Sequence, residues 1–469
     1  MSSPESTMPS PVSPPAATVS ANEAAPSGAI SPERIQDLRR ELASRPTTRL
    51  ARHAVAQTSV QDVALNRDVV TRTAHTFSHH LDDWPVTDQK NSGRCWMFAG
   101  LNLLRAGAMQ KMNLKEFEFS QNYPLFWDKF ERANYFLEAI IETADRDVDD
   151  RVVAFLLERP LEDGGQWNMF TNLIRKYGLV PKSAMPETES SSNTRRMNDV
   201  LLHKLREAAR TLREAKANGA AKGDLAAKKD EYLKVIFRML VIHLGLPPEQ
   251  FDWQWMDKDR KFHRHGTMTP QEFAKKFITI PYDEYVCIVH DPRPSSPFGR
   301  TFTVEYLGNV MEGGRVIYLN VEIDLMKKLA MQAIEEGEPV WMGCDVGQMM
   351  RGDLGIWDAR LYDYETLYDT EFTLNKADRL LHHQTQMTHA MLFTGVDILD
   401  GHPRRWRVEN SWSDKDGQKG FYTMNDSWFD EYMFEIAAPK SSLPPELQRA
   451  LSQEPIVLPP WDPMGALAR

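Results

Sequence analysis

The chain has 469 residues, 42% of them apolar, and a formal net charge of −10. A chain of this length can bury one large core or two to three smaller ones. No stretch approaches the roughly 18–20 consecutive apolar residues of a membrane span, and the negative charge argues against general affinity for nucleic acid. We therefore expect a globular protein without a membrane partner, for which nucleic acid is an unlikely ligand.

The N-terminus is rich in Pro, Ala and Ser, with seven prolines in the first 32 residues and no Lys or Arg before Arg34. A signal peptide has a basic start and an apolar centre, and both are missing here. We expect a disordered tail over 1–30; the alternative is a propeptide, although the pattern of a folded propeptide is absent. Helical patterns begin at Ser31-Pro32-Glu33, where the serine can cap a helix and the proline suits its first turn.

Cys95 stands directly before an apolar, helix-forming stretch, 99–112. A cysteine in the first turn of a helix lies near unpaired backbone N–H groups and the positive end of the helix dipole, and both favour the thiolate. Gln89, six residues earlier, can bring a side-chain amide to the same point and donate to an oxyanion. The alternative is a buried structural cysteine, with Gln89 as an exposed turn residue.

Short β-like runs dominate from Ile278 onward. One apolar, β-branched run begins at His389, and another, 405–409, leads into Asn410. The order Cys, His, Asn can place an imidazole beside the thiol and an amide behind the imidazole. Helices first and strands later indicate an α+β protein with two unlike lobes.

This order of residues resembles the papain-like cysteine peptidases, and within them the bleomycin hydrolase and aminopeptidase C branch. The likeness runs from about residue 34 to the end. Glycine is usual after Asn-Ser-Trp in this family, and this chain has Ser413 there. The segments that carry the resemblance are 91–96, 116–121, 163–167, 195–199, 340–347, 407–412 and 461–468.

The resemblance implies a papain-like two-lobe fold, with a helical lobe and a β-barrel-like lobe, and a role for each motif residue. Glycines without side chains let an extended peptide pair with the backbone, although a Gly-Gly pair by itself is more often a plain turn. The implied roles are nucleophile for Cys95, acid and base for His389, support of the imidazole for Asn410, oxyanion donor for Gln89, shielding from water for Trp412, and substrate binding for Gly164 and Gly165.

Papain-like enzymes carry their histidine about 130–150 residues after the cysteine, whereas His389 lies 294 residues after Cys95. An insertion of domain size is required, and the helical pattern of Arg195 to Phe277 supplies much of it. The expected divisions are a tail (1–30), N-terminal helices with the helical catalytic lobe (31–190), a helical insertion (191–277), a β-rich catalytic lobe (278–453) and a C-terminal arm (454–469).

The C-terminal arm, 454–469, has prolines at 455, 459, 460 and 463, so it should be extended and not helical. In the family that it resembles, this tail lies in the cleft and its carboxylate faces the free amino group of the substrate. The resemblance implies removal of Arg469, which leaves Ala468 to bind the substrate. Cleavage would then proceed one residue at a time from the N-terminus.

Three cysteines, Cys95, Cys287 and Cys344, form no C-x-x-C pair. A disulfide framework is therefore not expected, and a reducing, cytoplasmic setting suits a free catalytic thiol; Cys287 and Cys344 should be core residues. The histidine groups lack partner cysteines and an H-E-x-x-H pattern, so we expect no metal and no cofactor.

Between Arg195 and Arg238 there are twelve Lys or Arg and six Asp or Glu. This segment is either a solvated hairpin with mixed charges or, as the resemblance implies, a basic surface facing the channel of a homohexamer.

The main hypothesis is a cysteine aminopeptidase acting on peptides with a free N-terminus and on amide-bearing small molecules such as bleomycin. A catalytically silent scaffold, a nucleic-acid-binding ring and an acyl transferase are the alternatives.

Overall fold

The computed structural model describes residues 28–81 and 83–467. Apart from three residues, the expected N-terminal tail lies outside them. The chain divides into two compact units, and the smaller combines the residues up to Ala64 with Tyr364–Thr370. Its first helix begins as predicted, because the Ser31 side chain accepts a hydrogen bond from the Arg34 N–H. The helices of this unit are α1 (Pro32–Ala43), α2 (Pro46–Val55), α3 (Val60–Ala64) and α14 (Tyr364–Tyr368).

The larger unit is built around α5 (Cys95–Met112), which buries fourteen of its eighteen residues. A helix that is apolar on all sides belongs in a core, and α5 packs between α8 and the sheet strand β10. The larger unit contains further helices before the inserted segment. They are α4 (Arg67–Arg72), α6 (Asn122–Glu142), α7 (Arg151–Glu158), α8 (Trp167–Tyr177) and α9 (Glu189–Ser192).

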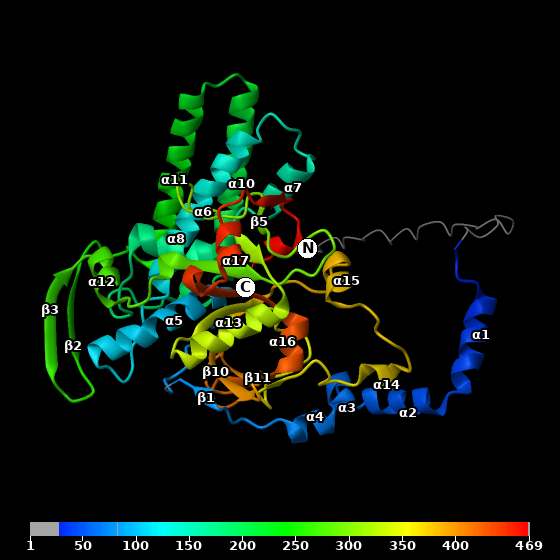
Figure 1. Ribbon diagram of the computed structural model, residues 1–469. Helices are drawn as coiled ribbons and strands as arrows, with labels where there is room; N and C mark the ends of the chain where they lie inside the picture. Colours follow the sequence, from blue (N-terminus) through cyan, green and yellow to red (C-terminus); the bar gives the residue numbers. More distant parts are fainter. Residues whose placement is uncertain (1–27, 82, 468–469) are drawn as a thin grey trace, which may run out of the picture. The chain divides into compact units, whose positions relative to one another are not determined.

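The inserted segment begins with two long helices, α10 (Arg195–Ala217) and α11 (Lys222–Leu244), which form the hairpin beside α6 in Figure 1. The helical prediction for this segment is wrong after α11, where β2 (Phe251–Met256) and β3 (Phe262–Met268) form a separate antiparallel pair. Alternating aromatic residues in β2 explain the difference, because a period of two suits a strand. Helix α12 (Pro270–Phe277) completes the segment.

The sheet of the larger unit has twelve strands among the described residues, in the order β14-β5-β6-β4-β13-β7-β10-β11-β12-β9-β8, with β1 paired to β10. Six of the predicted runs are strands: β4 (Tyr285–Val289), β5 (Thr301–Val304), β6 (Tyr318–Asn320), β7 (Val340–Cys344), β10 (His389–Leu399) and β11 (His402–Glu409). The others are β1 (His79–His80), β8 (Met350–Arg351), β9 (Ile356–Trp357), β12 (Phe421–Asn425), β13 (Met433–Pro439) and β14 (Ile456–Leu458).

Helices and short 3-10 turns cover the ends and one face of this sheet. Strand β10 lies between β7 and β11, and its first residue, His389, is paired with Cys344. Cys287 in β4 and Cys344 in β7 are buried and free, as the sequence predicts for core residues. The covering elements are α13 (Ile323–Glu335), α15 (Lys376–Leu381), α16 (Asp426–Tyr432), α17 (Pro445–Ala450), η1 (Tyr282–Glu284) and η2 (Lys440–Ser442).

The C-terminal arm is extended, as expected, over β14, which pairs in parallel with β5. The prediction that it contains no helix is wrong for one 3-10 turn, η3 (Pro463–Gly465). Proline fits the first turn of a helix, where its missing N–H is not needed. No helix in the described ranges has both the length and the apolar character that a membrane span requires.

Candidate active site

Cys95 is the first residue of α5 and is fully buried. Backbone N–H groups of Cys95, Trp96 and Ala390 face its sulfur. Because Ala390 follows His389 on β10, the packing of α5 on that strand brings the thiol to the start of the strand where the sequence predicts the histidine. The structure therefore brings together two residues that are far apart in the chain.

The imidazole of His389 is held by Asn410, the first residue after β11. Its Nε2 lies 2.9 Å from the Asn410 Oδ1, which also accepts a hydrogen bond of 2.8 Å from the Ser411 N–H. With Nε2 donating to an amide oxygen, Nδ1 is the ring nitrogen left to take a proton. This arrangement supports the role that the sequence predicts for Asn410.

Trp412 packs against the histidine, with ring centroids 4.7 Å apart. An indole at this distance reduces the access of water to the His389–Asn410 hydrogen bond, in agreement with the predicted shielding role. The next residue, Ser413, has a φ of 70°. That left-handed conformation is the one glycine adopts without strain, which explains why glycine is usual at this position.

Gln89 is brought to the same region because 87–89 runs antiparallel to 411–413. The Ser411 hydroxyl donates to the Gln89 Oε1 at 2.6 Å, and the Gln89 Nε2 donates to the Ser92 carbonyl at 2.5 Å. An amide nitrogen has two N–H groups. One N–H of the Gln89 amide therefore remains to donate to an oxyanion, and the contact with Ser411 fixes the orientation of that amide.

Burial sets the protonation of the pair. It raises the pKa of the Cys95 thiol to about 12, against the effect of the nearby N–H groups. It lowers the pKa of His389 to about 4, against the hydrogen bond to Asn410. Because both groups are buried, both shifts favour a neutral thiol and a neutral imidazole, in contrast to the thiolate that the position at the helix N-terminus predicts. A thiolate therefore forms only when the proton passes to His389.

Gly164 and Gly165 lie beside the nucleophile on the loop before α8. The Trp96 Nε1 donates to the Asp163 carbonyl at 2.7 Å, and a Cβ on Gly165 would lie 2.5 Å from the Trp96 ring. Only glycine fits there. The Gly164 carbonyl accepts a hydrogen bond from Arg132.

The C-terminal arm reaches this loop, since the Gln166 Nε2 donates to the Ala466 carbonyl at 2.8 Å. Leu467 is the last described residue and packs against the core. The predicted substrate-binding residue Ala468 and the removable Arg469 lie outside the described residues. The described part of the arm therefore contacts Gln166, the residue that follows Gly165.

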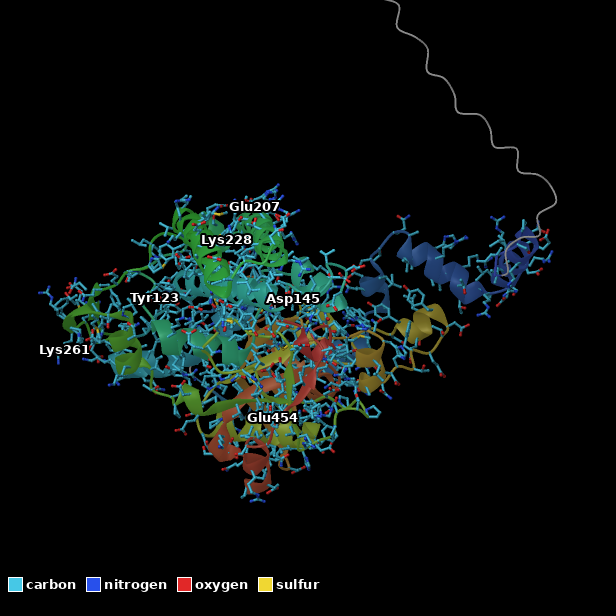
Figure 2. All side chains as sticks on the ribbon, turned by 90° about the horizontal axis from the view of Figure 1, so that it is seen from above. Tyr123, Asp145, Glu207, Lys228, Lys261 and Glu454 are labelled. Carbon is cyan, nitrogen blue, oxygen red and sulfur yellow. The ribbon has the colours of Figure 1, made fainter. Side chains whose placement is uncertain are left out.

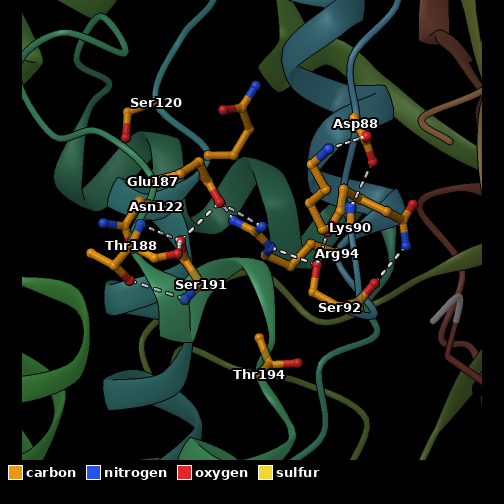
Figure 3. A network of polar contacts seen from close by, with 12 residues as sticks. Asp88, Lys90, Ser92, Arg94, Ser120, Asn122, Glu187, Thr188, Ser191 and Thr194 are labelled. Atoms are coloured by element: carbon orange, nitrogen blue, oxygen red, sulfur yellow. Dashed lines mark hydrogen bonds and ion pairs between the residues drawn. The ribbon is translucent and has the colours of Figure 1, made fainter. Parts of the chain in front are cut away.

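The loop between Gln89 and Cys95 is held by the segment that precedes α10. Arg94 is fully buried and makes two hydrogen bonds to Glu187, of 3.0 and 2.7 Å (Figure 3). Asn91 exchanges backbone hydrogen bonds with Ser192 and Thr194. The segment 187–194, just before α10, thereby supports the loop between Gln89 and Cys95, a role that the sequence analysis did not foresee because no local pattern marks a buried Arg–Glu pair.

Asp163 is a second support of this loop that the sequence analysis missed. Its carboxylate accepts from the Gly93 N–H at 3.2 Å, from Asn198 of α10 at 2.7 Å, and from the Lys129 ammonium. Although burial raises the pKa of Asp163, Lys129 and the hydrogen bonds hold it below the usual range. The sequence feature that could have pointed to Asp163 is its place in the motif 163–167.

Glu409, directly before Asn410, connects the two lobes. Its buried carboxylate accepts hydrogen bonds of 2.8 Å from Arg105 and 2.9 Å from Asn102, both on α5, and of 2.6 Å from Trp84. Burial raises the pKa of Glu409 above its ordinary value, against the effect of Arg105. The helix that carries Cys95 is thus joined to the strand that leads into Asn410.

Comparison with known proteins agrees with this geometry. A family model described as the Peptidase C1-like family matches residues 29–465. The chain belongs to this family. Human bleomycin hydrolase is 43% identical over 452 residues, which cover 94% of this chain and 99% of that protein.

Bacterial relatives place the chain in the same branch. Aminopeptidase C of Lactobacillus delbrueckii subsp. lactis is 40% identical over 442 residues, covering 94% of this chain and 98% of the relative. The crystal structure of PepW from Lactobacillus rhamnosis superposes with a TM-score of 0.93 at 44% identity, over 94% of this chain and all of that one. The papain-like α+β fold and the bleomycin hydrolase and aminopeptidase C branch, both expected from the sequence, are confirmed.

No cluster of three or more His, Cys, Asp or Glu that could hold a metal ion occurs within residues 28–81 and 83–467. In the histidine group at 263 and 265, His263 contacts a carboxylate: its Nε2 lies 2.8 Å from an Asp257 carboxylate oxygen.

Proposed function

We propose that the protein is a cysteine aminopeptidase in which Cys95 is the nucleophile and His389 the acid and base. One observation carries the proposal: the His389 Nε2 is held by Asn410, while the backbone N–H of the next residue on the same strand faces the Cys95 sulfur. The second ring nitrogen is then free for the thiol proton. Names of the relatives, bleomycin hydrolase and aminopeptidase C, support the same activity.

The reaction follows from the positions of these groups. His389 accepts the thiol proton as the Cys95 sulfur attacks the scissile carbonyl carbon, and the Gln89 amide with the Cys95 N–H stabilises the oxyanion. The tetrahedral intermediate collapses when His389 returns the proton to the leaving amine. Water, activated by His389, then hydrolyses the thioester and restores the free thiol.

The C-terminal arm restricts this chemistry to the first residue of a peptide. Its end lies beside Gly165, through the hydrogen bond between Gln166 and Ala466. The carboxylate of Ala468, exposed after loss of Arg469, would pair with the substrate ammonium, and exclusion of water would strengthen that pair. Amide-bearing small molecules with a free amine, such as bleomycin, fit the same requirement.

A peptide digest tests the proposal. We expect mass spectrometry to show residues leaving one at a time from a free N-terminus, and far slower cleavage of the same peptide when it is N-acetylated. Cys95→Ala should abolish turnover with an unchanged circular dichroism spectrum, since the substitution removes little volume. Equal alkylation of Cys287 and Cys344 by iodoacetamide, or activity that survives Cys95→Ala, would refute the assignment.

We further propose a cytoplasmic homohexamer. Three free cysteines suit a reducing compartment, and the family resemblance supports the assembly, with the inserted segment 195–277 as the main source of contacts. Light scattering at micromolar concentration should give about six times the chain mass of 53.8 kDa. A species of one chain mass would refute it.

A further inference from the structure

The described part of the C-terminal arm reaches the glycine loop at Ala466, yet after β14 it no longer follows the sheet. Residues 459–467 contain three of the four arm prolines and one 3-10 turn. Hydrogen bonds within this stretch are local, such as those from Gly465 to Asp462 and from Ala466 to Pro463. Contacts with the body of the enzyme must therefore set its position.

Asp462 makes the strongest of these contacts. The Arg293 guanidinium donates to both of its carboxylate oxygens, at 2.8 and 3.0 Å. The same guanidinium donates to both oxygens of Asp291, at 2.8 to 3.1 Å. The three side chains are at most a tenth exposed, and we call them the arm anchor.

The arm anchor is fixed to the sheet. Arg293 and Asp291 lie just after β4, and the Asp291 backbone exchanges hydrogen bonds of 2.8 and 2.9 Å with the buried Asn320 side chain at the end of β6. On the other side, the Asp462 Oδ1 caps η3 by accepting from the Met464 N–H at 2.9 Å. The guanidinium thus connects the sheet to the turn that leads into Ala466.

We infer that Arg293 is a specificity-determining residue: its ion pair with Asp462 holds the end of the arm in the cleft and so keeps the enzyme an aminopeptidase. The inference rests on the proposed role of the arm. Fork-shaped pairing fixes orientation as well as distance, which a flexible contact such as Gln166 with Ala466 cannot do alone. Arg151, stacked 3.7 Å from the Trp461 ring centroid, supports the preceding residue of the arm.

Asp462→Asn is the first variant, because it removes one charge and leaves Arg293 paired with Asp291. Arg293→Met is the second, and it leaves two buried carboxylates without their cation. Asp283→Asn is the control, because the shortest N–O distance to its partner Arg175, 2.7 Å, is close to the 2.8 Å between Arg293 and Asp462, but both side chains of the control pair are 49% exposed.

The readout is the ratio of kcat/KM for a peptide with a free N-terminus to that for its N-acetylated form. We expect the ratio to fall at least about tenfold in Asp462→Asn and further in Arg293→Met, because a buried charge pair loses a partner. The control should keep the wild-type ratio. Hydrogen exchange of 459–467, followed by mass spectrometry, should become faster in both variants and stay unchanged in the control.

A deletion of Gly465 to Arg469 separates this inference from the proposed function. If the deletion lowers the ratio while both anchor variants keep the ratio and the slow exchange, the anchor does not hold the arm and the inference is overturned. If the deletion itself leaves the ratio unchanged, the arm does not restrict cleavage and the proposed role of the arm fails. If Arg293→Met does not fold, the ratio and the exchange rate of Asp462→Asn still test the inference.

Discussion

At the scale of single residues, the choice of histidine decides the chemistry. His389 has its Nε2 fixed by Asn410, whereas His383 lies on a loop and lines a cavity beside the C-terminal arm. We expect His389→Ala to abolish turnover, because it removes the imidazole to which the mechanism assigns the thiol proton. His383→Ala should retain kcat, and steady-state kinetics on one peptide substrate compares the two. The opposite result would show that the wrong histidine has been assigned.

For Gln89 we predict a partial loss of activity on substitution. Its Nε2 has one N–H left for the oxyanion, and its Oε1 is held by Ser411. Gln89→Ala should lower kcat by about 10²–10³ and change KM little, because an oxyanion donor acts mainly in the transition state. Single-turnover kinetics checks this. A variant that changes KM alone would mean that Gln89 binds the substrate and not the oxyanion.

The buried carboxyl group of Glu435 should make the stability of the folded protein depend on pH. Burial raises its pKa to about 8, and one carboxylate oxygen has no hydrogen-bond partner among the described residues. The folded state keeps the proton that the unfolded state loses near pH 4.5, so this group costs stability as pH rises from about 4.5 to 8, by up to about 1.4 kcal/mol per unit. Glu435→Gln should raise the Tm at pH 8 and not at pH 4, measured by calorimetry.

The exposed Glu249 offers a control, since Glu249→Gln should leave the Tm unchanged at both pH values. A Glu435→Gln variant that loses stability at pH 8 would show that the carboxylate is charged and paired there. This residue was not predictable from the sequence. It belongs to β13, a strand for which no alternation was recognised, so neither its burial nor its titration could be anticipated.

At the scale of elements, the loop between Gln89 and Cys95 depends on its neighbours. Arg94 is fully buried and its partner Glu187 is 22% exposed. Glu187→Gln leaves a buried guanidinium without its counter-charge, which should lower the free energy of unfolding by about 2–3 kcal/mol, less than for a fully buried pair. Urea denaturation measures it. Glu207→Gln, which breaks a surface pair with Lys204, should cost about 0–1 kcal/mol; equal losses would contradict the argument.

The sequence predicts the elements that carry motifs well. The Ser31 cap, the cysteine helix and the strands at Val340 and His389 all occur where the patterns indicate them. The order of motifs identified the thiol, imidazole and amides because these residue types have few other reasons to occur in that order. Supports such as Arg94 with Glu187 could not be predicted, since their partners meet only after tertiary packing.

At the scale of the whole molecule, the sequence alone left open whether the segment from Arg195 to Arg238 forms a basic surface or a hairpin with mixed charges. Glu207 and Lys228, both labelled in Figure 2, lie on α10 and α11, whose sequences contain both acidic and basic residues. Half of the basic residues from Arg195 to Arg238 have acidic partners: Arg196 with Asp199, Lys204 with Glu207, Arg210 with Glu214, Lys216 with Asp145, Lys229 with Glu138, and Lys234 with Asp230.

This pairing and the net charge of −10 both reduce the attraction of the hairpin for a polyanion. We expect no binding of double-stranded DNA at about 0.15 M salt, measured by fluorescence anisotropy, because the electrostatic part of such binding falls steeply with salt. Any binding at low salt should disappear before that concentration. Binding that persists there would support a basic functional surface on the hairpin.

The position of β13 in the sheet has a consequence for biosynthesis. Although it is the second-last strand in the chain, it lies between β4 and β7 and so completes the support for the strand that carries His389. A growing chain on the ribosome carries Cys95 long before that gap is filled, and domains acquire their non-local contacts only when the late segments have emerged. The thiol therefore stays idle through most of synthesis. Once β13 is in place, only η2, α17 and the arm remain to leave the ribosome, so a newly made chain has only a short interval in which it could cleave other chains without the restriction that the arm imposes.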